Sequence, residues 1–178
     1  MFDLDTFIGD CRAAVDADAT HMAAAEVVRR AMANPDAVLA ELGEPEKPGI
    51  TPLYQSSDLT IINLAWAPML TIPPHNHEMW AVIGIYGGRE DNIFWRKVKD
   101  HPDGLIEAAG AKALSKGDVA PLGKDIIHSV TNPIPKLTAA LHVYGGDFFE
   151  AERSEWDSED LTEHPIDIEQ VKARFASG

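Results

Sequence analysis

The sequence predicts a mostly β protein: a small antiparallel barrel with α-helices before it and a helical tail after it. Three segments of different texture predict this class. Residues 2–41 are rich in alanine, with apolar side chains at helical spacing. Residues 59–144 contain short apolar or alternating runs between turn signals, which predict about seven or eight strands. Residues 147–178 are acidic with one amphipathic stretch. Strands at regular spacing without intervening helices are typical of an antiparallel sandwich or barrel.

Helices are expected over residues 2–41. Apolar residues recur there at the spacing of one helical face: Leu4, Phe7, Ile8, Cys11 and Val15. Asn34 followed by Pro35 predicts an N-cap with proline at the first helical position, and Gly43 predicts the end of that short helix. The prolines between residues 43 and 52 predict a linker into the β region.

Strands of the central segment are expected where apolar or alternating runs lie between turn residues. The runs are Leu59–Ala67, Trp80–Tyr86, Asn92–Lys99, Leu105–Leu114, Val119–Leu122, Ile126–Thr131 and Leu137–Tyr144. The turn signals are Pro73–Pro74, Gly87–Gly88, Pro102–Gly104, Lys116–Asp118, Asn132–Pro133 and Gly145–Gly146. In the tail, Ile168, Val171 and Phe175 share one helical face and predict a terminal helix.

Charge is unevenly divided along the single domain expected over residues 1–178. The helical segment (1–48) carries a formal charge of −6, the β-barrel core (49–146) carries −1 and the acidic tail (147–178) carries −7. The total of −14 disfavours nucleic acid and membrane surfaces as partners. The nearly neutral core repels an anionic small molecule less than the total charge implies. A homo-oligomer remains open.

The cysteine content and the N-terminus predict a cytoplasmic protein. Cys11 is the only cysteine, which excludes an intramolecular disulfide and a multi-cysteine metal cluster. The first ten residues lack the basic and apolar regions of a signal peptide. No apolar run approaches the roughly 20 residues that a bilayer span needs.

Three histidines form a candidate metal site. His75 and His77 are two residues apart, and a strand projects such residues to the same face, so both imidazoles can reach one ion. His128 lies 51 residues after His77, on a run expected to return beside the earlier strand. Histidine is the commonest metal ligand. The alternative is a pair of surface histidines and one hydrogen-bonded core histidine.

These residues resemble the ligands of the cupin superfamily, the double-stranded β-helix proteins. The first cupin motif pairs His-x-His with a later Glu and Gly, and the second motif supplies another His. Val82 stands about where the Glu ligand would be. Three histidines without the carboxylate are the pattern of the thiol dioxygenase branch. The resemblance therefore implies Fe(II) held by His75, His77 and His128.

Two stretches resemble that branch more closely. Residues 75–84, His-Asn-His-Glu-Met-Trp-Ala-Val-Ile-Gly, are similar to His-Asp-His-x-x-Trp-Gly-x-Ile-Gly of bacterial 3-mercaptopropionate dioxygenases. Residues 140–145, Ala-Leu-His-Val-Tyr-Gly, correspond to Ser-x-His-x-Tyr-Gly. The resemblance implies a catalytic pair in which His142 orients Tyr144. It also implies that Arg153, nine residues beyond that tyrosine, clamps a substrate carboxylate.

The sequence departs from the family pattern at several points. Asn76 stands where Asp is usual, and Ala140 replaces the serine of the Ser-His-Tyr relay. No cysteine matches the one that crosslinks to the tyrosine in animal cysteine dioxygenases. The segment Tyr54–Gln55 lacks the arginine of the cysteine-specific type. With Arg153 present, these departures favour the mercaptopropionate type or an unassigned relative.

Each assignment has a structural alternative. His142 and Tyr144 are also compatible with two core residues that satisfy each other's hydrogen bonds. Arg153 is compatible with a surface ion pair in the acidic tail. Trp80 is expected in the pocket wall, where it would contact substrate, or in the core. Glu90 is expected to be a solvated charge.

The function expected on this basis is oxidation of a small thiol carboxylate, 3-mercaptopropionate- or cysteine-like, to its sulfinate with O2. Three neutral imidazoles hold Fe(II) and leave positions for a thiolate and O2. The same ligands accept Zn, Ni, Cu or Mn. Two other functions remain open: a different three-histidine cupin oxygenase, such as one cleaving a β-diketone, and a non-enzymatic cupin that binds a metal or ligand.

Overall fold

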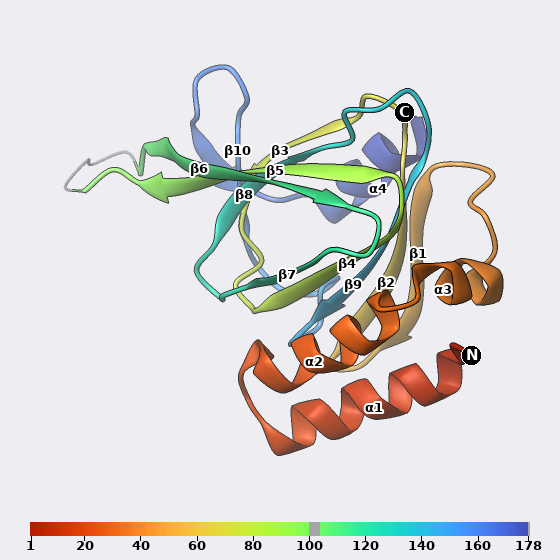
Figure 1. Ribbon diagram of the computed structural model, residues 1–178. Helices are drawn as coiled ribbons and strands as arrows, with labels where there is room; N and C mark the ends of the chain where they lie inside the picture. Colours follow the sequence, from red (N-terminus) through yellow and green to blue (C-terminus); the bar gives the residue numbers. More distant parts are fainter. Residues whose placement is uncertain (100–103, 178) are drawn as a thin grey trace.

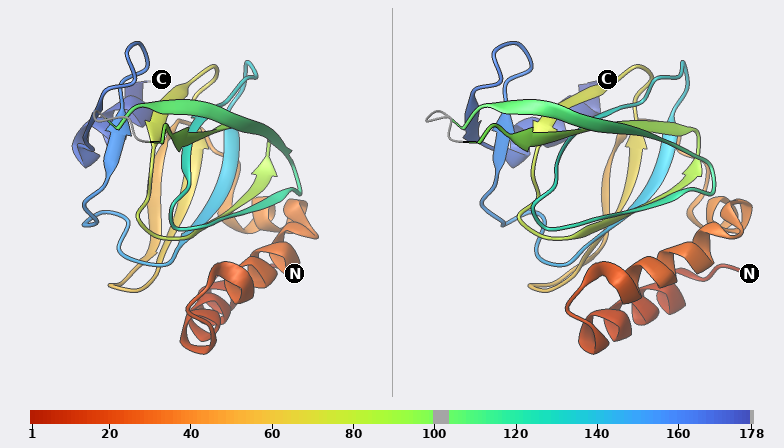
Figure 2. Two further views of the ribbon diagram at one scale, coloured as in Figure 1. Left: turned by 90° about the vertical axis from the view of Figure 1, so that its left-hand side faces the viewer. Right: turned by 60° about the vertical axis from the view of Figure 1, so that its left-hand side comes forward.

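The fold consists of two antiparallel sheets that face each other (Figures 1 and 2). The computed structural model describes residues 1–99 and 104–177. One sheet has the order β1 (Gly49–Gln55), β2 (Thr60–Trp66), β9 (Thr138–Tyr144), β4 (Ala81–Gly87) and β7 (Val119–Leu122). The other has the order β11 (Glu163–Pro165), β10 (Ser154–Trp156), β3 (Thr71–His75), β8 (Ile127–Thr131), β5 (Arg89–Lys97) and β6 (Ile106–Ser115). The predicted mostly β, antiparallel class is confirmed.

The strand order identifies a double-stranded β-helix. Between β2 and β9 the chain passes repeatedly from one sheet to the other, so that β2, β4, β7 and β9 share one sheet and β3, β5, β6 and β8 share the second. This is the eight-strand jelly-roll arrangement in which two sheets enclose one core. As a result, strands far apart in the sequence become neighbours, and β3 pairs directly with β8.

The sheet that contains β4 and β9 is buried on both faces. One face meets the interior between the sheets, through side chains such as Ile83 and Ala140. The other face packs, through Val82 and Leu141, against the helical layer of α1 (Leu4–Ala17), α2 (His21–Met32) and α3 (Pro35–Leu42). Figure 1 shows these helices against the outer side of that sheet. Burial on both faces explains why β4 and β9 read as continuous apolar runs.

The helix signals at the N-terminus are confirmed. The Asn34 side chain accepts a hydrogen bond from the Ala37 N–H, and Pro35 occupies the first turn of α3. Gly43 ends the helix with φ 82°, a conformation that glycine adopts without strain. Contact with the sheet is close: a Cβ on Gly84 would lie 2.7 Å from Val28 Cγ1 of α2.

Four strands lie outside the seven predicted runs. The segment expected to be a linker, residues 43–52, contains the start of β1, an edge strand where proline is tolerated. The pair Pro73–Pro74 lies within β3, at the irregularity where the pairing with β8 skips from Ile72 to His75. The acidic tail contributes β10 and β11 to the second sheet.

Of the turn expected at Pro102–Gly104, residues 102 and 103 lie outside the described residues.

The predicted terminal helix is present as α4 (Ile168–Ser177). Val171 and Phe175 are buried in the interior cluster, and the Phe175 ring lies 4.6 Å from that of Trp66 on β2. Figure 2 shows α4 on the side of the barrel away from α1. The helix therefore closes part of the interior. None of the helices in the described ranges is long and apolar enough to span a bilayer.

Candidate metal centre

The three predicted ligands are brought together inside the barrel. His75 at the end of β3 is the Cα partner of His128 on β8. One nitrogen from each of His75, His77 and His128 lies within 4.8 Å of the others. His77 was predicted to lie on the same strand as His75. It lies in the following loop instead, because β3 ends at His75. The loop nevertheless returns His77 Nε2 to 3.4 Å from His128 Nε2.

Two hydrogen bonds orient these ligands for a metal. His128 Nδ1 lies 2.7 Å from Asn92 Oδ1, and His75 Nδ1 lies 2.9 Å from the Pro73 carbonyl oxygen. Both oxygens only accept hydrogen bonds, so Nδ1 donates in each ring and the Nε2 lone pair is left for an ion. Converging imidazole nitrogens with fixed tautomers suit a divalent transition metal.

The protonation state also suits metal binding. Burial lowers the pKa of His75 to about 4, the largest cause being loss of hydration around the charged ring. Burial, followed by the neighbouring imidazoles, lowers the pKa of His77 well below its ordinary value. His128 has its pKa lowered well below 6.5 for the same reasons. All three rings are therefore neutral at pH 7 and free to coordinate.

Asn76, between two ligands, connects the ligand loop to β10. Its Oδ1 accepts the Ser154 N–H at 2.8 Å, and its Nδ2 donates to Glu78 Oε1 at 2.7 Å. Asp, which is usual in the resembled family, lacks the amide donor for the second bond. The loop thus holds its shape through Asn76 and is tied to the residue next to Arg153.

The histidine cluster faces a narrow, mostly apolar cavity. Six of the predicted site residues line it: His75, His77, His128, His142, Tyr144 and Arg153. The apolar part of the wall includes Phe148 and, from α4, Val171 and Phe175. Trp80 does not line this cavity. It packs with the helical layer and against Gly145, where an added Cβ would lie 2.1 Å from a ring atom.

Arg153 is a buried cation rather than a surface ion-pair partner. It is 7% exposed, its guanidinium lies 4.1 Å from the Phe148 ring centroid, and Nη1 donates to the Phe148 carbonyl. Its Nε is buried without a hydrogen-bond partner, and within residues 1–99 and 104–177 no carboxylate forms an ion pair with it. Burial lowers the pKa of Arg153, although a guanidinium stays charged in proteins.

Trp66 is a cavity residue that the sequence analysis missed. Its indole lines the cavity, and its Nε1 is buried without a hydrogen-bond partner among the described residues. Alternation along β2 places Ile62, Leu64 and Trp66 on the inner face. That alternation is a signal that could have identified Trp66.

The expected pair of His142 and Tyr144 is present, with 3.0 Å between His142 Nδ1 and Tyr144 Oη. Burial raises the pKa of Tyr144 well above its ordinary range, so its hydroxyl stays protonated at neutral pH. His142 Nε2 lies 3.3 Å from Glu90 Oε2. Glu90 is 0% exposed, so the prediction of a solvated charge was wrong. The predicted strand began at Asn92 and missed that Glu90 and Asn92 share a face of β5.

Val82 does not face the histidines, although the family pattern puts a carboxylate ligand near it. Its side chain packs in the helical layer, and the inward-facing residues beside it are Ala81 and Ile83. The described part of β4 therefore offers no carboxylate to the cluster.

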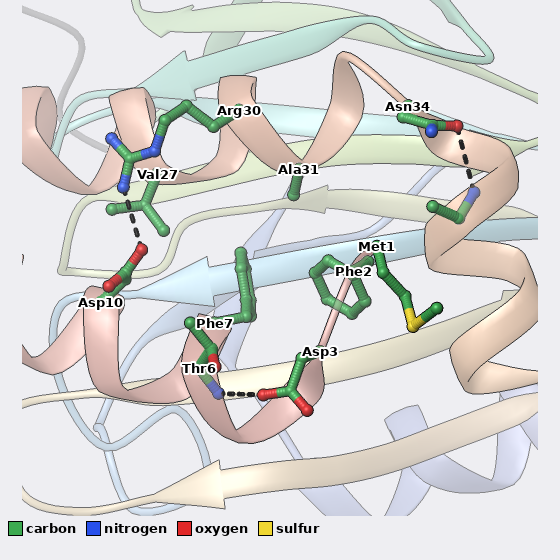
Figure 3. Close-up of a pocket in the computed structure, with 11 residues that line it drawn as sticks. Met1, Phe2, Asp3, Thr6, Phe7, Asp10, Val27, Arg30, Ala31 and Asn34 are labelled. Atoms are coloured by element: carbon green, nitrogen blue, oxygen red, sulfur yellow. Dashed lines mark hydrogen bonds and ion pairs between the residues drawn. The ribbon is translucent and has the colours of Figure 1, made fainter.

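A larger pocket of about 240 Å³ lies between α1, α2 and the start of α3 (Figure 3). Four of its polar side chains are already engaged: Asp3 and Asn34 cap helices, and Asp10 pairs with Arg30. Figure 3 shows these bonds running along the walls. The pocket holds no cluster of metal-ligating side chains among the described residues.

No protein-family model matches the chain. Among solved structures, it is similar to a deletion mutant of Bacillus subtilis oxalate decarboxylase, with 16% identity, a TM-score of 0.46, and coverage of 61% of this chain and 28% of that chain. A Klebsiella pneumoniae protein with a double-stranded β-helix domain has 14% identity, a TM-score of 0.45 and coverage of 64% and 82%.

The cupin domain of Schizosaccharomyces pombe Cnp3 has 10% identity, a TM-score of 0.45 and coverage of 55% of this chain and 60% of that domain's chain. The chain spans 28% of the length of the oxalate decarboxylase it matches. The strand order and the three-histidine cluster by themselves fit a cupin.

Proposed function

We propose that the protein is a non-haem Fe(II) dioxygenase that oxidises a small thiol carboxylate, 3-mercaptopropionate- or cysteine-like, to its sulfinate with O2. One observation carries this proposal: Arg153, a buried cation whose Nε has no hydrogen-bond partner among the described residues, lines the same cavity as the three histidines. A buried charge without a counter-ion is costly, and an anionic ligand in the cavity would remove that cost.

His75, His77 and His128 would hold the metal through neutral imidazoles. Fe(II), when bound there, supplies the activation of O2 and accepts the substrate thiolate, whose sulfur gains both oxygen atoms. Neutral ligands leave the charge of the ion uncompensated, which favours an anionic sulfur ligand.

Arg153 would bind the substrate carboxylate. A guanidinium offers donors in a planar fork that matches a carboxylate, and burial strengthens such a charge-assisted bond. Arg153 and Ile166 line both this cavity and a second, more open pocket. A neutral β-diketone would leave the guanidinium unpaired.

Tyr144 would contact the substrate or O2 through its hydroxyl oxygen, and Trp66 would contact it as a donor through Nε1–H. The Tyr144 hydroxyl keeps its proton, because burial raises its pKa. The Trp66 Nε1–H lacks an acceptor in the described chain. Phe148, Val171 and Phe175 exclude water from the remaining wall.

The experiment is turnover of anaerobically purified, iron-loaded protein with a panel of small thiols, following O2 uptake and sulfinate by mass spectrometry. We expect one sulfinate per O2 with thiol carboxylates and little reaction with propanethiol. His128→Ala, with its fold checked by circular dichroism, is the inactive control. No turnover with any thiol would overturn the proposal and leave the non-enzymatic alternative. Parallel loading with Mn, Zn and Ni tests the choice of metal.

A further inference from the structure

We infer that Glu90 is a positioning residue for this site. It serves as the fixed acceptor that sets the tautomer of His142 and thereby the orientation of Tyr144. It would thus occupy the place that a serine hydroxyl holds in the Ser-His-Tyr relay of the resembled family. The inference rests on the proposed function for its catalytic meaning, but the hydrogen-bond geometry stands independently.

Two chains of hydrogen bonds end at the Glu90 carboxylate. In the first, His142 Nε2 lies 3.3 Å from Glu90 Oε2, and His142 Nδ1 lies 3.0 Å from Tyr144 Oη. In the second, His128 Nδ1 lies 2.7 Å from Asn92 Oδ1, and Asn92 Nδ2 donates to Glu90 Oε1 at 3.0 Å. One carboxylate therefore connects a metal ligand with the Tyr144 pair.

The direction of both chains follows from Glu90. Both Glu90 oxygens act as acceptors in these contacts, so His142 donates from Nε2 and Asn92 turns its amide nitrogen toward Glu90. The Asn92 oxygen then faces His128, whose Nδ1–H donates to it and whose Nε2 lone pair stays available. With the proton on Nε2, His142 Nδ1 is left as the acceptor for the Tyr144 hydroxyl.

The buried position of Glu90 is not explained by a contribution to fold stability. Its side chain is 0% exposed, and no Lys or Arg of the described residues forms an ion pair with it. A buried carboxyl group held by one imidazole and one amide is unfavourable for folding relative to an apolar group of similar shape. Proteins recurrently keep a buried carboxylate where it orients the histidines of a metal site.

Ala140 explains why an acceptor from another strand is needed. Ala140, His142 and Tyr144 alternate along β9, and Ala140 and Tyr144 both belong to the interior cluster. The Ala140 methyl has no hydrogen-bonding atom, so β9 itself cannot satisfy His142 Nε2. Glu90 reaches it from β5, in the opposite sheet.

The first test reads the tautomer directly. Long-range ¹H–¹⁵N spectra of ¹⁵N-histidine-labelled full-length protein, metal-free and Zn(II)-loaded, show which ring nitrogen carries the proton. We expect His142 to be protonated on Nε2 in the wild type and to lose this preference in Glu90→Gln, which keeps the side-chain shape. Glu107→Gln is the matched control, because Glu107 lies in an exposed ion pair with Arg96. A wild-type His142 protonated on Nδ1 alone, or an unchanged spectrum in Glu90→Gln, overturns the inference.

The second test is kinetic. In iron-loaded protein, Glu90→Gln should lower kcat for sulfinate formation by about 10- to 100-fold, the range typical of residues that orient a metal ligand, as Glu90 does for His128 through Asn92. The KM for the thiol should change little, because Arg153 is untouched. Recovery of kcat and tautomer in Glu90→Gln/Ala140→Ser would support the role, because the new hydroxyl restores an acceptor on β9. If no thiol is oxidised, the proposed function fails while the spectra still decide the role of Glu90.

Discussion

Glu90 Oε2 and His142 Nε2 lie 3.3 Å apart, and their side chains are only 0% and 4% exposed. The contact crosses the barrel, because β5 and β9 belong to opposite sheets. It joins a carboxyl group to an imidazole in a region that water does not reach. Such a contact stabilises a particular arrangement of protons more than it stabilises the fold.

We therefore expect Glu90→Gln to separate stability from activity. Replacing the buried carboxyl group by an amide should leave the free energy of unfolding unchanged or raise it, by roughly 0–2 kcal/mol, while activity falls. Urea unfolding of the metal-free variant and wild type measures this. A clear loss of stability would show that the carboxylate holds the fold together, and its effect on activity would then be indirect.

Arg153→Met is expected to weaken substrate binding. A charge-assisted hydrogen bond contributes about 1.5–3 kcal/mol, so KM for a thiol carboxylate should rise by roughly 10- to 150-fold. Propanethiol, which lacks the carboxylate, should show no further loss. Arg96→Met is the matched control, since Arg96 is exposed and pairs with Glu107. Equal losses with both thiols would argue against a clamp.

Asn92→Leu should weaken metal binding without removing a ligand. The substitution deletes the oxygen that accepts from His128 Nδ1 and leaves the ring free to change tautomer. We expect metal affinity to fall by about 10- to 100-fold in a competition titration with a chelator. Asn63→Leu is the control, because Asn63 bonds only Tyr86 among the described contacts. Equal affinities in the two variants would contradict the role of Asn92.

The fold was predictable because it depends on local patterns, and parts of the site were not because they depend on tertiary neighbours. Alternation and turn residues identified β7 with its observed bounds and most other strands within two or three residues. Pro73 and Pro74 concealed β3, since the irregular pairing that accommodates them is visible only in the folded sheet. The burial of Glu90 likewise requires β9 from the opposite sheet, which no local pattern of β5 reveals.

The metal-free protein should lose stability as the pH falls from about 6.5. Burial lowers the folded-state pKa of His75 to about 4, while an unfolded chain takes up the proton near 6.5. Between these values the unfolded state binds more protons, so acidification favours unfolding. His75 alone would contribute on the order of 3 kcal/mol over this window. Urea unfolding at pH 7 and pH 5 measures the effect, which should be smaller in His75→Gln; equal pH dependence in both proteins would contradict it.

Gly145→Ala should test whether Trp80 has a packing role rather than a substrate role. A Cβ at Gly145 would lie 2.1 Å from Trp80 Cε2 and 2.2 Å from Nε1, so the indole must move. Overpacking of this kind typically destabilises by about 1–3 kcal/mol. Gly110→Ala is the control, because nothing lies within 4 Å of its added Cβ.

The double variant Gly145→Ala/Trp80→Leu tests whether the loss of stability comes from the clash with the Trp80 indole. If the clash with the indole causes the loss, the smaller side chain should relieve it, and the two effects should not add. Because Trp80 packs with the helical layer and does not line the histidine cavity, Trp80→Leu should lower stability without changing KM for a thiol. A raised KM with unchanged stability would instead return Trp80 to the substrate-binding residues.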